Sequence, residues 1–146
     1  MKKQSPEAGQ SMVLMAILML LVFIPLLAIA MNIPKAIYVR VQLQAATDAA
    51  CEAAAQAIDW DTFQNSGVAQ IDLGLGRGWA QREFVKTVIN SGMVGYSPGL
   101  TSVTRISPLI AECHASASVG GYFHSIIGTD FMVTAVSVSE SRVESR

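Results

Sequence analysis

The feature that most constrains this chain is an uncharged, strongly apolar run near its N-terminus. No charged residue lies between Glu7 and Lys35, which leaves 27 consecutive uncharged positions. A helix needs about 20 apolar residues to cross the roughly 30 Å hydrocarbon core of a bilayer, where it satisfies its own backbone groups. The run therefore predicts a transmembrane anchor over residues 11–33. Pro25 lies inside it, which transmembrane helices tolerate.

The same run is open to a second interpretation, a cleaved secretory signal. Lys2 and Lys3 would form its charged N-terminal region, and the Ala-Ile-Ala sequence at 28–30 resembles a small-x-small cleavage site. The apolar core of a signal usually spans about 7–15 residues, so the greater length of this run favours a retained anchor. Both interpretations place the rest of the chain outside the cytoplasm.

The charges on either side of the run predict its orientation. The first ten residues carry two lysines and one acidic residue, whereas residues 35–146 carry eight basic and ten acidic side chains. Positive charge favours the cytoplasmic side of a membrane. We therefore expect a single-pass protein of the cytoplasmic (inner) membrane, with residues 1–10 in the cytoplasm and the C-terminal domain outside it.

The predicted helix continues beyond the membrane as an amphipathic stalk over residues 34–58. After Pro34 this stretch lacks glycine and proline and is rich in alanine, glutamine and leucine, which are strong helix formers. Apolar and small residues recur at every fourth position: Ile33, Ile37, Val41, Ala45, Ala49, Ala53 and Ala57. Because alanine allows another backbone to approach closely, we expect the four alanines of this set to form a packing interface.

Residues 59–146 predict a small extracytoplasmic domain of helices and strands that packs on the stalk. The clearest strand is 111–119, where small apolar and polar residues alternate strictly. The other expected elements are a connection at 60–67, a short strand at 68–73, a glycine-rich turn at 74–78, a helix at 79–91, an edge strand at 100–106, a hydrophobic helical plug at 120–128 and a long strand at 131–143. The fold class is therefore α+β: a long helix on a small antiparallel sheet, with one additional helix.

Two cysteines are the most informative polar residues. Cys51 lies on the predicted stalk, and Cys113 lies on the apolar face of the clearest strand. In an oxidising compartment the two thiols could form a disulfide between stalk and sheet. They could equally remain buried free thiols that behave as small hydrophobic residues. Disulfide geometry cannot be deduced from sequence, so both interpretations stay open.

The sequence contains no catalytic, metal or cofactor pattern. Cys113 and His114 are neighbours on a strand, so they point to opposite faces, and no zinc-ligand spacing occurs. The glycines at 74–78 match neither phosphate-loop pattern. With 10 basic and 11 acidic side chains, the chain has no electrostatic footprint for nucleic acid. We expect no enzyme activity, no cofactor, no metal and no nucleic-acid partner.

Two stretches resemble the TadE/TadG-like family of tight-adherence (Flp) pilus assembly proteins. The first begins at Gly9-Gln10-Ser11 and runs through the anchor into 40–50, where a Leu-Gln-Ala-Ala…Asp-Ala-Ala pattern is similar to that of the family's helix. The second is 115–139, in which a small-residue strand, an aromatic plug and a Val/Thr/Ala/Ser strand resemble the end of short TadG-type proteins.

This resemblance implies a function. It indicates a membrane-anchored, non-enzymatic, TadG-like accessory or minor pilin-like subunit, with a pilin-like fold, in a Tad/Flp-type pilus or related secretion apparatus. Its expected partners are membrane lipid and other subunits of that apparatus, with self-association as a further option. It would reside in the inner membrane or in a cell-surface pilus. The alternative is a secreted extracytoplasmic binding protein whose apolar segment is a cleaved signal peptide.

Overall fold

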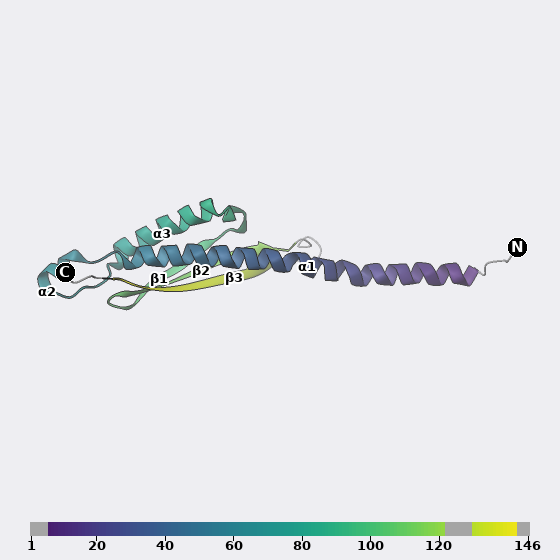
Figure 1. Ribbon diagram of the computed structural model, residues 1–146, viewed down its shortest axis with the longest axis horizontal. Helices are drawn as coiled ribbons and strands as arrows, with labels where there is room; N and C mark the ends of the chain where they lie inside the picture. Colours follow the sequence, from purple (N-terminus) through teal and green to yellow (C-terminus); the bar gives the residue numbers. More distant parts are fainter. Residues whose placement is uncertain (1–5, 122–129, 143–146) are drawn as a thin grey trace.

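The computed structural model describes residues 6–121 and 130–142, and it has an α+β fold in the form of a rod with a lobe at one end (Figure 1). The elements in chain order are α1 (Pro6–Ala55), α2 (Trp60–Ser66), α3 (Leu73–Asn90), the 3-10 helix η1 (Met93–Tyr96), β1 (Gly99–Ser107), β2 (Ile110–Gly120) and β3 (Asp130–Glu140). The predicted fold class is confirmed, with α2 and η1 in addition to the one extra helix expected.

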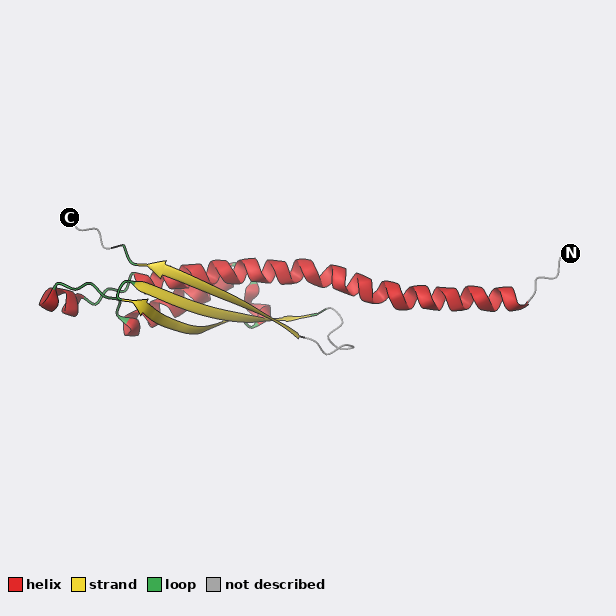
Figure 2. Ribbon diagram, turned by 90° about the horizontal axis from the view of Figure 1, so that it is seen from below, coloured by secondary structure: helices red, strands yellow, loops and turns green. Residues whose placement is uncertain are grey.

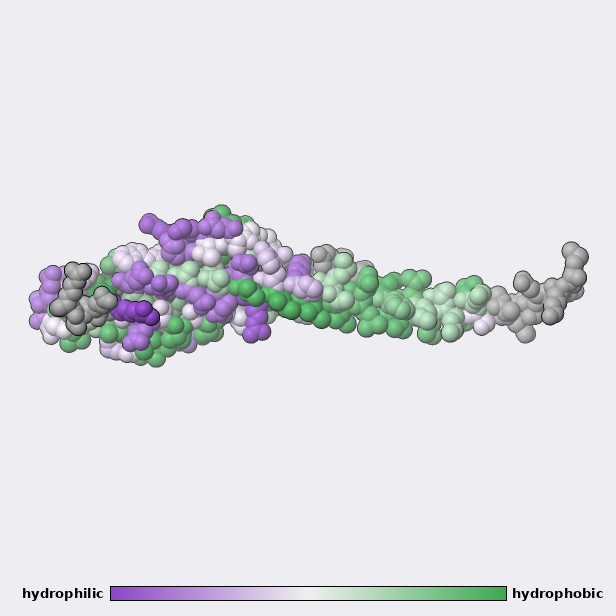
Figure 3. All heavy atoms as spheres, viewed as in Figure 1, coloured by the Kyte–Doolittle hydropathy of each residue, from purple (hydrophilic) through white to green (hydrophobic). Residues whose placement is uncertain are grey.

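Helix α1 is continuous over 50 residues and contains both Pro25 and Pro34. At about 1.5 Å per residue it is roughly 75 Å long. Its first half protrudes from the lobe, and the apolar side chains there are exposed, as the green surface in Figure 3 shows. The helix is long and apolar enough to cross a membrane.

The lobe is built on a three-stranded antiparallel sheet in the order β1-β2-β3. The central strand, β2, alternates buried and half-buried residues along its whole length, which confirms the pattern predicted for 111–119. Its register places Cys113 opposite Val103 of β1 and Ser137 of β3. The strand predicted at 131–143 is also present, as β3.

Helices α1 and α3 lie side by side on one face of this sheet, and the opposite face carries no helix in the described part of the chain (Figure 2). The core fills the space between the two helices and the sheet. Its largest fully buried side chains include Leu43 of α1, Phe84 of α3 and Met93 of η1. The second half of α1 is therefore the central element of the lobe.

Two predictions for the stretch after α1 are wrong. Residues 60–66 form helix α2 where a connection was expected, because the Asp59 side chain caps the first turn and Gly67 ends the helix with a left-handed φ of 71°. Residues 68–73 do not form a strand. Ile71 makes only an isolated bridge to Ile58.

The predicted glycine-rich turn at 74–78 is also wrong. These glycines lie in the first turns of α3, which begins at Leu73 after the N-cap residue Asp72. The Asp72 carboxylate accepts hydrogen bonds from the backbone N–H groups of Gly74 and Leu75, at 2.7 and 3.2 Å. This cap begins the helix six residues before the predicted start. The hydrophobic plug predicted at 120–128 falls mostly on residues outside those described.

Candidate functional site: the seam between the long helix and the sheet

The candidate site is the seam, by which we mean the buried surface where α1 packs on the sheet. On α1 the buried residues recur every three to four positions, singly at first and then as pairs of neighbours, which is the spacing of one helix face. The fully or almost fully buried residues of this half of α1, which packs on both the sheet and α3, are Val39, Leu43, Ala46, Thr47, Ala50, Cys51, Ala54 and Ala55. On the sheet it meets the small buried residues of β2: Ala111, Cys113, Ala115, Ala117 and Val119. Small residues on both sides let the helix and the strands approach closely.

The position of the seam differs from the alanine stripe expected from the sequence. Ala57 is buried, Ala49 and Ala53 are half-buried, and Ala45 is exposed. A strict four-residue spacing advances by about 40° per step on a helix of 3.6 residues per turn, so such a stripe winds around the helix. Within α1 two steps carry the stripe from the exposed Ala45 to the half-buried Ala53, and Ala57 lies beyond the end of the helix at Ala55.

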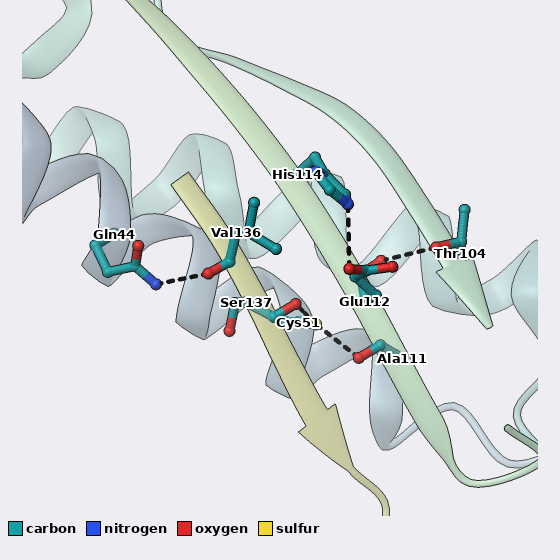
Figure 4. Close-up of polar contacts among 8 residues, drawn as sticks. All are labelled: Gln44, Cys51, Thr104, Ala111, Glu112, His114, Val136 and Ser137. Carbon is teal, nitrogen blue, oxygen red and sulfur yellow. Dashed lines mark hydrogen bonds and ion pairs between the residues drawn. The ribbon is translucent and has the colours of Figure 1, made fainter. Parts of the chain in front are cut away.

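Polar side chains form hydrogen bonds at the solvent-exposed edge of the seam. The Gln44 side-chain amide donates a hydrogen bond to the Val136 carbonyl of β3 at 3.0 Å (Figure 4) and another to the Asp48 carboxylate at 2.9 Å. Inside the seam, the buried Thr47 hydroxyl donates to the Leu43 carbonyl at 2.7 Å. Both buried and border polar groups on this face of α1 therefore have partners.

The seam brings the two predicted cysteines together. Both are 0% exposed and both are free cysteines. The Cys51 thiol donates to the carbonyls of Ala111 and Ser137, each at 3.3 Å (Figure 4). Ala111 precedes Cys113 by two residues on the same strand face, and Ser137 is the cross-strand partner of Cys113. These two contacts place the Cys51 sulfur above the Cys113 position.

The contact between the two thiols shifts their pKa values in opposite directions. A hydrogen bond from the Cys113 thiol lowers the pKa of Cys51, although burial acts in the opposite direction. The same hydrogen bond, together with burial, raises the pKa of Cys113. Of the two thiols, Cys51 is therefore the one whose thiolate form is favoured by the contact between them.

A second set of contacts fastens the lobe to α1 just beyond the apolar run. The Lys35 ammonium donates to the Gly120 carbonyl at the end of β2, at 2.6 Å, and lies 5.6 Å from the centre of the Tyr96 ring. The Tyr38 hydroxyl donates to the Ser91 carbonyl at 2.9 Å. We call Lys35, Tyr38 and Tyr96 the clasp. Lysine and tyrosine are typical of membrane–water interfaces.

The remaining candidate residues lie apart from the seam. His114 and Glu112 are on the outer face of β2, with His114 Nε2 3.4 Å from Glu112 Oε1 (Figure 4). Cys113 points to the opposite face, as the strand geometry requires. Among the residues that the structure describes, no three His, Cys, Asp or Glu side chains are grouped to hold a metal ion.

Comparison with known proteins gives a match for the long helix. A family model described as putative Flp pilus-assembly TadE/G-like matches residues 9–57. The matched segment is about a third of the chain and covers both the apolar half of α1 and the half that packs on the sheet. Over this segment the chain is similar to that family, and this similarity and the long apolar helix fit a membrane-anchored pilus component. Neither the curated proteins nor the solved structures gave a match.

Proposed function

We propose that this protein is a membrane-anchored, non-enzymatic, TadG-like component of a Tad/Flp-type pilus or related secretion apparatus. It acts as an accessory or minor pilin-like subunit. Residues 1–10 lie in the cytoplasm, 11–33 span the inner membrane, 34–58 form the stalk, and 59–146 form the extracytoplasmic lobe. One observation carries the proposal: the first half of α1 exposes its large apolar side chains, whereas the second half is the core of the lobe.

The exposed half of α1 favours a lipid environment on energetic grounds. Burying one large aliphatic or aromatic side chain stabilises a protein by about 1.5–3 kcal/mol relative to leaving it in water. From Met12 to Ile33 this segment exposes seventeen large hydrophobic side chains. A bilayer covers all of them, and the helix satisfies its own backbone hydrogen bonds inside it.

The geometry supports a docking role for the lobe. The clasp holds the lobe against α1 directly above the apolar segment, so the anchor sets both the height and the orientation of the lobe over the membrane. A lobe held in this way presents fixed surfaces to neighbouring subunits. Its partners in this proposal are other subunits of the apparatus, further copies of the chain, or both.

Complementation of a deletion strain tests the proposal. We expect loss of this protein to remove or reduce surface pili counted by electron microscopy, and the full chain to restore them. The matched control replaces residues 1–30 with a cleavable signal peptide, which releases the same lobe without its anchor and is expected not to restore pili. Normal piliation in the deletion strain, or full rescue by the released lobe, would contradict the proposal.

One observation favours the alternative, a secreted binding protein. Among the described side chains of α1, all the buried ones except Ala28 lie at Val39 or later. Cleavage after Ala30 would therefore leave the core helix of the lobe intact. The N-terminus of the native protein distinguishes the two functions. A chain that begins at Met31 would support secretion, and a chain that retains residues 11–30 supports the anchored subunit.

A further inference from the structure

We propose that Cys51 and Cys113 form an intramolecular disulfide in the exported protein and so join α1 covalently to the central strand of the sheet. The inference rests on the proposed function in one respect, since disulfides persist in compartments outside the cytoplasm. It goes beyond that function because it adds a covalent link that neither the anchor nor the family match requires.

The surroundings of the two sulfur atoms support the link. The Cys51 sulfur lies 3.3 Å from the carbonyl oxygens of both Ala111 and Ser137, which flank Cys113 along its strand and across the sheet. Both cysteines are 0% exposed, so neither faces solvent or an external partner. A disulfide needs Cα atoms within about 4.4–6.8 Å, and a seam lined with alanine allows such an approach.

The hydrogen bonds of the Cys51 thiol hold its sulfur over the sheet in the reduced protein. In the reduced protein the Cys51 thiol donates to strand carbonyls. Those carbonyls belong to Ala111 and Ser137, at the positions where strands β2 and β3 face α1, so the reduced thiol already lies over the sheet. In the bridged protein a covalent bond replaces these weak thiol hydrogen bonds, and α1 keeps the same position on the sheet.

The oxidation is a thiol–disulfide exchange with a disulfide oxidoreductase of the cell envelope. A Cys51 thiolate attacks one sulfur of the donor disulfide, which forms a mixed disulfide and releases the first donor thiolate. The Cys113 thiolate then attacks the Cys51 sulfur and releases the second donor thiolate. Two protein thiols lose two electrons and two protons, and the donor disulfide becomes two thiols. Because both cysteines are buried in the folded lobe, the exchange takes place before α1 has fully docked on the sheet.

The direct test is peptide mapping of the full chain from its native host. Cells are lysed and denatured in excess N-ethylmaleimide, and the protein is digested without reductant. We expect a peptide pair linked through Cys51 and Cys113 and no alkylation of either residue. After dithiothreitol, both should alkylate, and the midpoint of thermal unfolding should fall by on the order of 10 °C or more. Alkylation of both cysteines without reductant, or a link to another molecule, would overturn the proposal.

A second arm separates this proposal from the proposed function. The purified, reduced full chain is unfolded and refolded in a glutathione redox buffer, with the Cys51→Ala/Cys113→Ala variant as the control that cannot bridge. We expect the unsubstituted chain to bridge, and only its unfolding midpoint to respond to dithiothreitol. Failure to bridge in this buffer would overturn the disulfide and leave the proposed function standing. A chain that bridges here but carries free thiols in cells would overturn the proposal and place the lobe in a reducing compartment, contrary to the proposed function.

Discussion

At the residue scale, Gly76 determines how closely α3 approaches α1. A Cβ added at this position would lie 3.1 Å from the Ala54 carbonyl oxygen and 3.6 Å from the Ala57 Cβ, whereas a Cβ at Gly78 would meet nothing within 4 Å. The first of these contacts is to backbone, so it cannot be relieved by rotating a side chain. The two glycines therefore form a matched pair on one helix.

We predict opposite effects for Gly76→Ala and Gly78→Ala on the free energy of unfolding. The first should destabilise the lobe by about 1–2 kcal/mol through overpacking. The second should stabilise it by up to about 1 kcal/mol, because alanine is the better residue in an exposed helix interior. Chemical unfolding of the full chain in detergent measures both. Equal effects of the two substitutions would show that α3 does not pack on α1 at this point.

Asp59 gives the lobe a local pH dependence. Its carboxylate accepts hydrogen bonds from the Thr62 hydroxyl at 2.6 Å and from the Thr62 backbone N–H at 3.0 Å. These hydrogen bonds, with a further one from the Gln70 side chain, favour the charged form and lower the pKa of Asp59. A lowered pKa means that the cap stabilises α2 above the unfolded-state pKa and is lost as the pH falls through the folded-state value.

We predict that the Thr62 amide resonance titrates with a midpoint below that of an ordinary aspartate. The measurement is an NMR pH titration of the full chain in detergent micelles. Asp59→Asn keeps an N-cap acceptor and removes the ionisable group, so its Thr62 resonance should not titrate in this range. An ordinary aspartate midpoint in the unsubstituted chain would show that the cap does not form in solution.

At the element scale, the most important feature is which side of α1 faces the sheet. Ala50 is 0% exposed in the seam, whereas Ala45, five residues earlier, is exposed. The sheet therefore faces a side of the helix that the four-residue alanine stripe only partly predicted.

We predict that Ala50→Leu destabilises the lobe by about 1–3 kcal/mol, since Ala50 is fully buried and a larger side chain there must displace its neighbours. Ala45→Leu, the same change on the exposed side, should alter stability by no more than about 0.5 kcal/mol. Thermal unfolding of both variants gives the comparison. If Ala45→Leu proved the more damaging, the helix would be rotated relative to the structure described here.

The elements that were predicted correctly are those with long, regular patterns. The apolar run and the alanine-rich stretch define α1, and strict alternation defines β2. Helix α2 was missed because seven residues carry little periodicity, although Asp59 and Gly67 provide both cap signals. The glycines of α3 predict a turn when considered locally, and packing on α1 overrides that preference.

The candidate site could be predicted only in part. The compartment and the strand alternation single out Cys51 and Cys113 as a pair, but their contact depends on the register of α1 over the sheet. That register is set by tertiary packing rather than by local sequence. The clasp was missed for the same reason: Lys35 and Tyr38 meet Gly120, Tyr96 and Ser91, which are 53 or more residues away in the chain.

At the scale of the whole molecule, one helix belongs to two environments. The apolar half of α1 suits lipid, and the other half packs inside a lobe whose surface carries both hydrophilic and hydrophobic side chains (Figure 3). The helix runs between them without a break, and the clasp lies just beyond the last residues of the apolar run. The apolar segment and the lobe therefore share one continuous helix, which suits the proposed docking of the lobe at a membrane surface.

Thiol labelling at two positions of α1 tests this account most directly. Leu20 is 59% exposed and Ala45 is also exposed in the isolated chain, while both native cysteines are buried. In cells with a permeable outer envelope, a membrane-impermeant maleimide should label Ala45→Cys and leave Leu20→Cys unlabelled, with the unsubstituted chain as background. Rapid labelling of Leu20→Cys, or protection of Ala45→Cys, would contradict an anchor in lipid that continues into an extracytoplasmic lobe.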